Sequence, residues 1–103
     1  MDNYLVIVAA GSGSRVGADI PKQYIRINKK PVIVHTINRF MNSLNFSKIV
    51  VVISEEHQIL WDNINNEYLF NNVEITHGGN TRFESVKNGL KLVPENVVVG
   101  IHD

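Results

Sequence analysis

Four short runs of apolar, mostly β-branched residues recur along the chain and predict buried strands. They cover Tyr4–Val8, Ile49–Ile53, Val73–Thr76 and Val97–Ile101. Their largely continuous apolar character is typical of parallel strands that are covered on both faces.

The segments between these strands carry helical signals. Pro31 stands where a helix can begin, and the apolar residues after it recur at near-helical spacing: Val32, Ile33, Ile37, Phe40 and Met41. After the second strand, Ser54 is predicted to cap a helix whose first turn holds two glutamates. Four apolar residues are predicted to line the buried face of that helix: Ile59, Leu60, Ile64 and Leu69.

The third helix has the clearest boundaries. Thr81 and Glu84 fit the T-x-x-E capping box, and Pro94 stops the helix. Its predicted buried stripe consists of Phe83, Val86, Leu90 and Val93. Strands that alternate with helices predict an α/β fold with a parallel sheet.

We interpret residues 1–103 as part of a single domain. Ligands of open α/β sheets bind beyond the carboxyl ends of the strands, and His102 and Asp103 lie just past the fourth strand. A domain that stops at such a place is expected to be truncated after its fourth strand.

Composition narrows the class of protein. With 44% hydrophobic and 19% charged residues, the sequence is that of an ordinary globular domain. The absence of cysteine excludes disulfides and thiolate metal sites. Because the apolar runs are too short for a membrane span and no signal-peptide pattern opens the chain, we expect a cytoplasmic protein without a membrane partner.

Charge is unevenly distributed. Residues 1–48 hold seven Lys/Arg and two Asp/Glu, a balance of +5, whereas residues 49–103 hold three and eight, a balance of −5. The basic residues are scattered around a glycine-rich turn, with few aromatic residues for base stacking. We therefore expect a small phosphorylated ligand and no nucleic-acid partner.

That glycine-rich turn follows the first strand directly. Its glycines allow backbone N–H groups to converge on an anion, and Arg15 and Lys22 add positive charge. A dinucleotide loop needs G-x-G-x-x-G, but after Gly11 and Gly13 the third glycine comes one place late, at Gly17. No Gly-Lys-Ser/Thr of a Walker loop occurs in the chain. The turn thus predicts a polyphosphate site of another kind.

Three segments are expected to meet at one sheet edge, because each follows a strand. They are Ala9–Gly17, Gly78–Arg82 and His102–Asp103. Asp103 is a candidate ligand of a divalent cation such as Mg²⁺, which takes one or two carboxylates together with phosphate oxygens and water. No nucleophile and base are paired in the sequence. If the attacking group is itself an anionic phosphate, in-line positioning and charge stabilisation suffice for catalysis.

Four motifs, in order along the chain, resemble those of the 2-C-methyl-D-erythritol 4-phosphate cytidylyltransferase family. They are Ala9-Ala-Gly-Ser-Gly-Ser-Arg15, Pro21-Lys-Gln-Tyr24, Gly78-Gly-Asn-Thr-Arg-Phe-Glu-Ser-Val86 with Asn88-Gly-Leu90, and Ile101-His-Asp103. The resemblance covers only the amino-terminal part of that longer enzyme. It implies a Rossmann-like nucleotidyltransferase sheet, a homodimer, and transfer of CMP from CTP to a polyol phosphate, methylerythritol phosphate, in non-mevalonate isoprenoid synthesis.

The resemblance also implies roles for individual residues. The nucleotide and its triphosphate would be held by Ala9, Ala10, Gly11 and Gly13. Arg15 and Lys22 would be catalytic and would stabilise the five-coordinate α-phosphate. The cytosine would be read by Gly79, Asn80 and Ser85, on a turn shaped by Arg82. Asp103 would bind Mg²⁺.

The sequence departs from the family pattern at three positions. Val8 replaces the common proline, Val16 the common methionine, and Asn80 the aspartate of some members. Two alternatives stay open: a ribitol-5-phosphate cytidylyltransferase, whose loop and reaction are similar, and a non-catalytic nucleotide-binding fragment. Residues beyond Asp103 would complete the metal and acceptor sites, so this chain alone is expected to be inactive.

Overall fold

A four-stranded parallel sheet forms the centre of the computed structural model, which describes residues 3–10, 20–43 and 46–103. The strands are β1 (Asn3–Ala9), β4 (Lys48–Ile53), β5 (Val73–His77) and β6 (Val98–His102). They lie in the order β5-β4-β1-β6, so β1 is flanked by β4 and β6. All four predicted strands and their parallel arrangement are confirmed.

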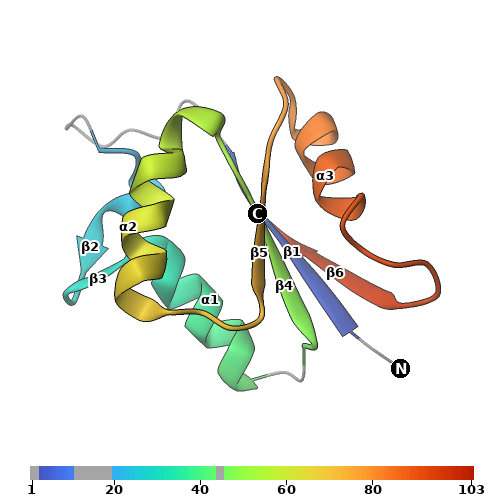
Figure 1. The fold of residues 1–103 in the computed structure, drawn as a ribbon, viewed down its shortest axis with the longest axis horizontal. Coiled ribbons are helices and arrows are strands. Elements are labelled where there is room, and N and C mark those ends of the chain that lie inside the picture. Colours follow the sequence, from blue (N-terminus) through green and yellow to red (C-terminus); the bar gives the residue numbers. More distant parts are fainter. Residues whose placement is uncertain (1–2, 11–19, 44–45) are drawn as a thin grey trace.

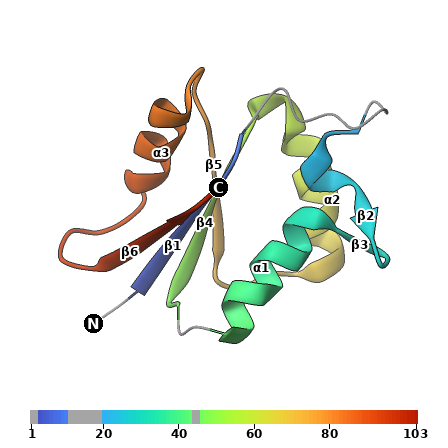
Figure 2. The same cartoon turned by 180° about the vertical axis from the view of Figure 1, so that it is seen from behind.

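Helices cover both faces of this sheet (Figures 1 and 2). Helices α1 (Val32–Ser43) and α2 (Gln58–Tyr68) lie on one face, and α3 (Arg82–Leu90) lies on the other. This is the layered α/β arrangement that the alternation of elements predicts. Among the helices described, none combines the length and the apolar character needed to cross a membrane.

The larger part of the core lies between the sheet and the pair α1 and α2. Ile33, Val34 and Ile37 of α1 are fully buried there, and Trp61 and Ile64 of α2 are almost fully buried. Ile33 and Ile37 belong to the predicted apolar face, whereas Val34 was not predicted to be buried and Met41, which was, is 37% exposed. Burial of aliphatic side chains of this size stabilises the fold by roughly 1.5–3 kcal/mol each.

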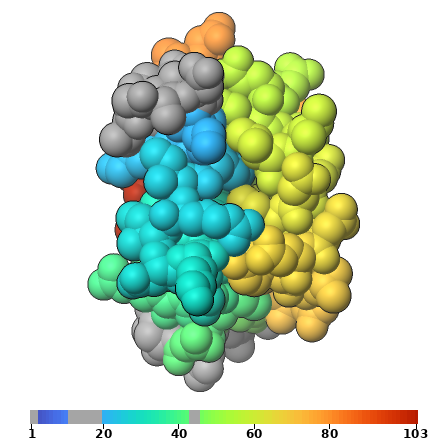
Figure 3. Space-filling view, turned by 90° about the vertical axis from the view of Figure 1, so that its left-hand side faces the viewer, coloured from blue at the N-terminus to red at the C-terminus, as the bar shows by residue number. Residues whose placement is uncertain are grey.

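A two-stranded hairpin was not foreseen. It consists of β2 (Arg26–Ile27) and β3 (Lys30–Pro31), joined by Asn28 and Lys29 at φ 53° and 71°. Such positive φ angles are usual in two-residue hairpin turns, but glycine is the residue that normally signals them. Arg26 donates to the Glu67 carboxylate of α2 at 2.8 Å, and Figure 3 shows the hairpin packed against that helix.

Two details of the second helical segment differ from expectation. Ser54 does not cap it: its hydroxyl donates instead to the carbonyl of Ala10 at 2.9 Å, and a short 3₁₀ helix (Glu55–His57) precedes α2. Ile59 and Leu69, predicted to be buried, are 74% and 72% exposed. Leu69 lies just beyond the last helical residue with a left-handed backbone, so its side chain leaves the helix face.

Helix α3 begins as predicted but buries a different face. The capping box of Thr81 and Glu84 is present in full. The buried residues are Ser85 and Gly89, one turn apart, whereas Phe83 is 76% exposed. A Cβ at Gly89 would come within 2.7 Å of Val6 and 2.9 Å of Val52, so the helix lies close to the sheet. Because α3 lies so close to the sheet, only small residues fit on its buried face, and the large side chain of Phe83 points to solvent.

Candidate functional site

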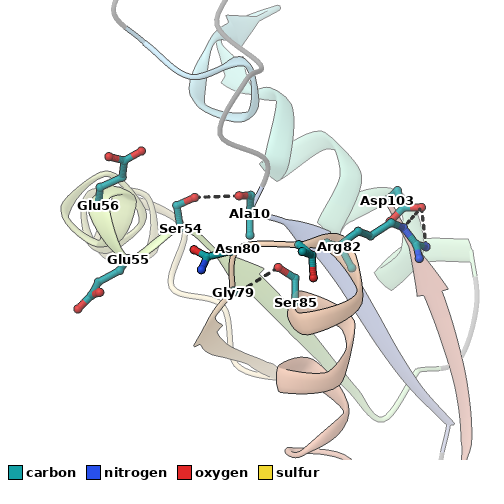
Figure 4. A pocket seen from close by; sticks show the side chains of 12 residues that line it. Ala10, Ser54, Glu55, Glu56, Gly79, Asn80, Arg82, Ser85 and Asp103 are labelled. Atoms are coloured by element: carbon teal, nitrogen blue, oxygen red, sulfur yellow. Dashed lines mark hydrogen bonds and ion pairs between the residues drawn. The ribbon is translucent and has the colours of Figure 1, made fainter.

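A large cavity lies where the parallel strands end, on the carboxyl side of the sheet (Figure 4). It has a volume of about 710 Å³ and is reached by residues that follow β1, β4, β5 and β6. The lining residues are Val8, Ala10, Ser54, Glu55, Glu56, Gly78, Gly79, Asn80, Thr81, Arg82, Ser85 and Asp103. The sheet topology therefore brings together segments far apart in sequence, as expected of open α/β sheets.

The turn from β5 into α3 forms one wall. The Gly78 amide donates to the carbonyl of Ile53 at 2.8 Å, which holds the turn on β4. A Cβ at Gly78 would collide with the Cβ of Ala10 and the hydroxyl of Ser85. Only glycine fits there, because Ala10, which follows β1, and Ser85 of α3 both contact the turn at this point. The Gly79 amide donates to the Ser85 hydroxyl at 3.2 Å, so the buried Ser85 fixes the turn from within the helix.

Glu84 secures the amino-terminal end of α3. Its Oε1 accepts hydrogen bonds from the backbone amides of Asn80 at 2.9 Å and Thr81 at 3.2 Å. The Thr81 hydroxyl in return accepts from the amide of Glu84 at 3.1 Å. The amides of Asn80, Thr81 and Glu84 are therefore already hydrogen-bonded. A ligand at this wall would bind the side chain of Asn80 rather than these amides.

Arg82 and Asp103 join α3 to the end of β6. The guanidinium Nε lies 2.9 Å from Oδ1 of Asp103, and Nη2 lies 2.8 Å from Oδ2. This paired geometry is the one that guanidinium and carboxylate groups favour. The hydrogen bonds from Arg82 hold the pKa of Asp103 below its ordinary value, and Asp103 raises the pKa of Arg82. A negative charge is thus kept at the cavity rim, with a cation beside it.

Ser54, Glu55 and Glu56 line the same cavity and were not foreseen as site residues. The sequence pattern predicted only that these three residues begin a helix. They follow the second strand directly, so the rule that places the other segments at this edge could have found them. The hydrogen bond from Ser54 to Ala10 ties the end of β4 to the end of β1.

A second, smaller cavity of about 250 Å³ adjoins the first. It is lined by Val8, Ala9, Pro21, Lys22, Gln23, Tyr24, His57 and Asp103. Val8 and Asp103 also line the larger cavity, so the two spaces meet at the carboxyl end of β1. Lys22 brings an exposed ammonium group to this second space.

Comparison with known proteins assigns the family. The sequence model of the IspD family, 2-C-methyl-D-erythritol 4-phosphate cytidylyltransferase, matches residues 4–103. The chain belongs to this family. All four motifs quoted for the resemblance lie within the matched residues.

Individual relatives agree with this assignment. The 2-C-methyl-D-erythritol 4-phosphate cytidylyltransferase of Clostridioides difficile is 46% identical over 101 residues, covering 96% of this chain and 43% of the relative. That of Porphyromonas gingivalis is 44% identical, covering 97% of this chain and 45% of the relative. The crystal structure of 4-diphosphocytidyl-2C-methyl-D-erythritol synthase from Anaerococcus prevotii superposes with a TM-score of 0.78 at 26% identity, covering 99% of this chain and 42% of that one. The IspD fold predicted from the motifs is confirmed, and this chain spans less than half of each of these relatives.

The structure distributes the predicted IspD residues between the two cavities. Those at the larger cavity are Ala10, Gly79, Asn80, Arg82, Ser85 and Asp103. Ala9 and Lys22 line the smaller one, which Asp103 also reaches. Gly11, Gly13 and Arg15 lie outside the described residues. The roles of all these residues stay predictions.

Where the two cavities meet, a metal would find one carboxylate among the residues that line both, that of Asp103, rather than a complete protein cage. Within residues 3–10, 20–43 and 46–103, no group of three or more His, Cys, Asp or Glu side chains could hold a metal ion. A single exposed aspartate at the junction of both cavities suits Mg²⁺, which completes its shell with phosphate oxygens and water. Arg82 donates to both oxygens of Asp103, and the remaining lone pairs of these oxygens would be the ones open to Mg²⁺.

Proposed function

We propose that this chain is the nucleotide-binding part of an enzyme that transfers CMP from CTP to 2-C-methyl-D-erythritol 4-phosphate. The products are 4-diphosphocytidyl-2-C-methyl-D-erythritol and pyrophosphate. The observation that carries the proposal is the family match over residues 4–103, together with the two adjoining cavities at the strand ends that described residues of all four motifs line. The cytoplasmic setting and the homodimer implied by the resemblance belong to the same proposal.

The larger cavity is the site proposed for the cytidine. Gly79, Asn80 and Ser85 stand on one wall, and the hydrogen bond from Gly79 to Ser85 fixes their spacing. A rigid wall with polar groups at set positions can distinguish one base from another, because a wrongly placed donor or acceptor leaves a buried group unpaired. Arg82 shapes the same turn and holds Asp103.

The smaller cavity, which Lys22 lines, is the site proposed for the reacting phosphates. In the proposed reaction an anionic oxygen of methylerythritol phosphate attacks the α-phosphorus of CTP, and the bond to the pyrophosphate oxygen breaks. The nucleophile is already ionised, so no general base is required. Lys22, together with Arg15, stabilises the negative charge of the five-coordinate α-phosphate. Mg²⁺ held at Asp103, when bound, supplies further neutralisation of the triphosphate.

The first test uses the intact protein with Mg²⁺, and it measures pyrophosphate release. We expect release with CTP plus methylerythritol phosphate, and much slower release when UTP, GTP or ATP replaces CTP. Ribitol 5-phosphate is the matched alternative acceptor: faster release with it would assign the other cytidylyltransferase activity. No release with either acceptor would contradict the enzymatic proposal.

A second test examines the 103-residue chain itself. A ligand that binds only the folded state raises the unfolding midpoint, and at 100 times its Kd it adds about 2.7 kcal/mol to stability. We expect CTP with Mg²⁺ to raise the midpoint more than UTP or NAD does. A rise with NAD alone would contradict a cytidine site in this part of the protein.

A further inference from the structure

Three buried polar atoms beside Lys22 have no hydrogen-bond partner among the described residues. They are the hydroxyl of Tyr24 and the two ring nitrogens, Nδ1 and Nε2, of His57. Tyr24 is 7% exposed and His57 is 5% exposed, and both line the smaller cavity. Glu56 Oε1 lies 3.5 Å from His57 Nε2 but does not complete a hydrogen bond.

The polar atoms do not stabilise the fold as it stands. Tyr24 and His57 pack edge to face, with ring centroids 5.6 Å apart. Phenylalanine at either position would keep an aromatic contact and would avoid burying an unpaired polar group, which is unfavourable. Unpaired buried groups in native proteins call for an explanation, and a ligand is one of the established explanations.

The chemistry of these atoms selects the ligand. Burial raises the pKa of Tyr24 to about 12, so its hydroxyl remains a hydrogen-bond donor at neutral pH. An imidazole ring carries at least one N–H in either charge state. Together with the Lys22 ammonium, these groups favour an anion with several oxygens. Asp103 lines the same cavity, and its carboxylate favours a cation that accompanies the anion.

We propose that Tyr24 and His57 form a phosphate subsite with Lys22, in which they hydrogen-bond the pyrophosphate end of the nucleotide. The identity of this anion rests on the proposed function. The three atoms are covered in the structure, so the anion draws the two rings toward the cavity as it binds. The subsite therefore couples the turn that carries Lys22 to the start of α2, where His57 lies.

The test is the affinity of the intact protein for inorganic pyrophosphate with Mg²⁺, measured by calorimetry. Tyr24→Phe keeps the ring and removes the hydroxyl, and His57→Phe puts a somewhat larger aromatic ring in place of the imidazole and removes both ring nitrogens. Each should weaken pyrophosphate binding about tenfold, as expected when a hydrogen bond to a charged group is lost. Tyr68→Phe is the matched control, because this α2 tyrosine is stacked on Phe70 and does not line the smaller cavity. The Tyr68→Phe variant should bind pyrophosphate with the affinity of the unmodified protein.

Thermal unfolding separates ligand binding from a structural role. Tyr24→Phe should unfold at the same temperature as the unmodified protein or above it, because an unpaired hydroxyl has been removed. Unchanged pyrophosphate affinity in both Phe variants would overturn the subsite, and so would an unmodified protein that does not bind pyrophosphate. The two proposals can fail separately. If the enzyme uses another nucleotide, the proposed function fails, but weaker pyrophosphate binding by the Phe variants would still support the subsite, because all nucleoside triphosphates carry the same β- and γ-phosphates.

Discussion

Arg82 hydrogen-bonds both carboxylate oxygens of Asp103, and so links the first turn of α3 to the end of β6 across the rim of the larger cavity. The two residues are 21 positions apart in sequence. Each has a proposed role of its own, in shaping the base-reading turn and in binding Mg²⁺. Their contact means that a change at one alters the pKa and the position of the other.

Arg82→Gln should raise the pKa of Asp103 toward its ordinary value, because the hydrogen bonds from Arg82 are what lower it. Carboxyl-carbon NMR over an acid titration measures this directly. The lowered pKa contributes stability above the ordinary pKa of an aspartate, and that contribution disappears as the pH falls through the lowered value. Stability of the variant should thus depend less on pH in the acid range. Lys87→Gln removes a positive charge elsewhere on α3 and should leave the pKa of Asp103 unchanged; an equal rise in both variants would contradict a specific pair.

Gly89 should not tolerate a side chain, because α3 lies against Val6 and Val52 at this point. The Cβ of Gly89→Ala would meet fully buried valines at 2.7 and 2.9 Å, and overpacking of this kind costs about 1–3 kcal/mol. The gain in helix propensity offsets about 1 kcal/mol of that loss. We expect a net fall in the free energy of unfolding, measured by urea denaturation.

Gly100→Ala is the control for that substitution. A Cβ at Gly100 would lie 3.5 Å from the nearest atom, in Leu5, which is ordinary contact. Its stability should stay within about 0.5 kcal/mol of the unmodified chain. Equal losses at Gly89 and Gly100 would show that the close approach of α3 does not decide the outcome.

Thr81 should contribute to stability through its hydroxyl alone. Thr81→Ala removes the cap from the amide of Glu84, and the loss of such a cap costs about 1 kcal/mol. Thr81→Ser keeps a hydroxyl at the same position and should restore most of the loss. Urea denaturation of the two variants measures the difference; a serine variant as unstable as the alanine variant would mean that the threonine methyl group is what matters.

Where local signals are strong, sequence reasoning placed the elements correctly. The four strands are marked by apolar β-branched runs, and the start of α3 by its capping box. The faces of α2 and α3 were harder to predict. Phe83 and Ile59 look like core residues by spacing, but the distance between helix and sheet decides which residues fit, and Gly89 sets that distance for α3. That distance is a tertiary property, which no local pattern in the chain records.

The site was predictable to the extent that topology determines it. Parallel strands end on one edge, so Ala10, Gly79 and Asp103 could be placed together in advance. The bond between Arg82 and Asp103 could not, because it depends on how far each side chain reaches. The contact of Tyr24 with His57 could not be predicted either, because the two residues lie in separate segments and no local pattern shows which buried polar atoms stay unpaired.

Lys22 provides the sharpest test of the proposed chemistry. If its ammonium acts mainly on charge that develops at the α-phosphate, Lys22→Ala should lower kcat by at least about 100-fold while the Kd for CTP changes much less. Lys30→Ala is the matched control, because Lys30 is an exposed lysine of the β2–β3 hairpin and lines neither cavity. Its kcat should equal that of the unmodified enzyme, because Lys30 contacts neither cavity. Steady-state rates of pyrophosphate release and calorimetric CTP binding give the two numbers. A Lys22 variant that loses CTP affinity and keeps its kcat would assign this residue to ground-state binding instead of catalysis.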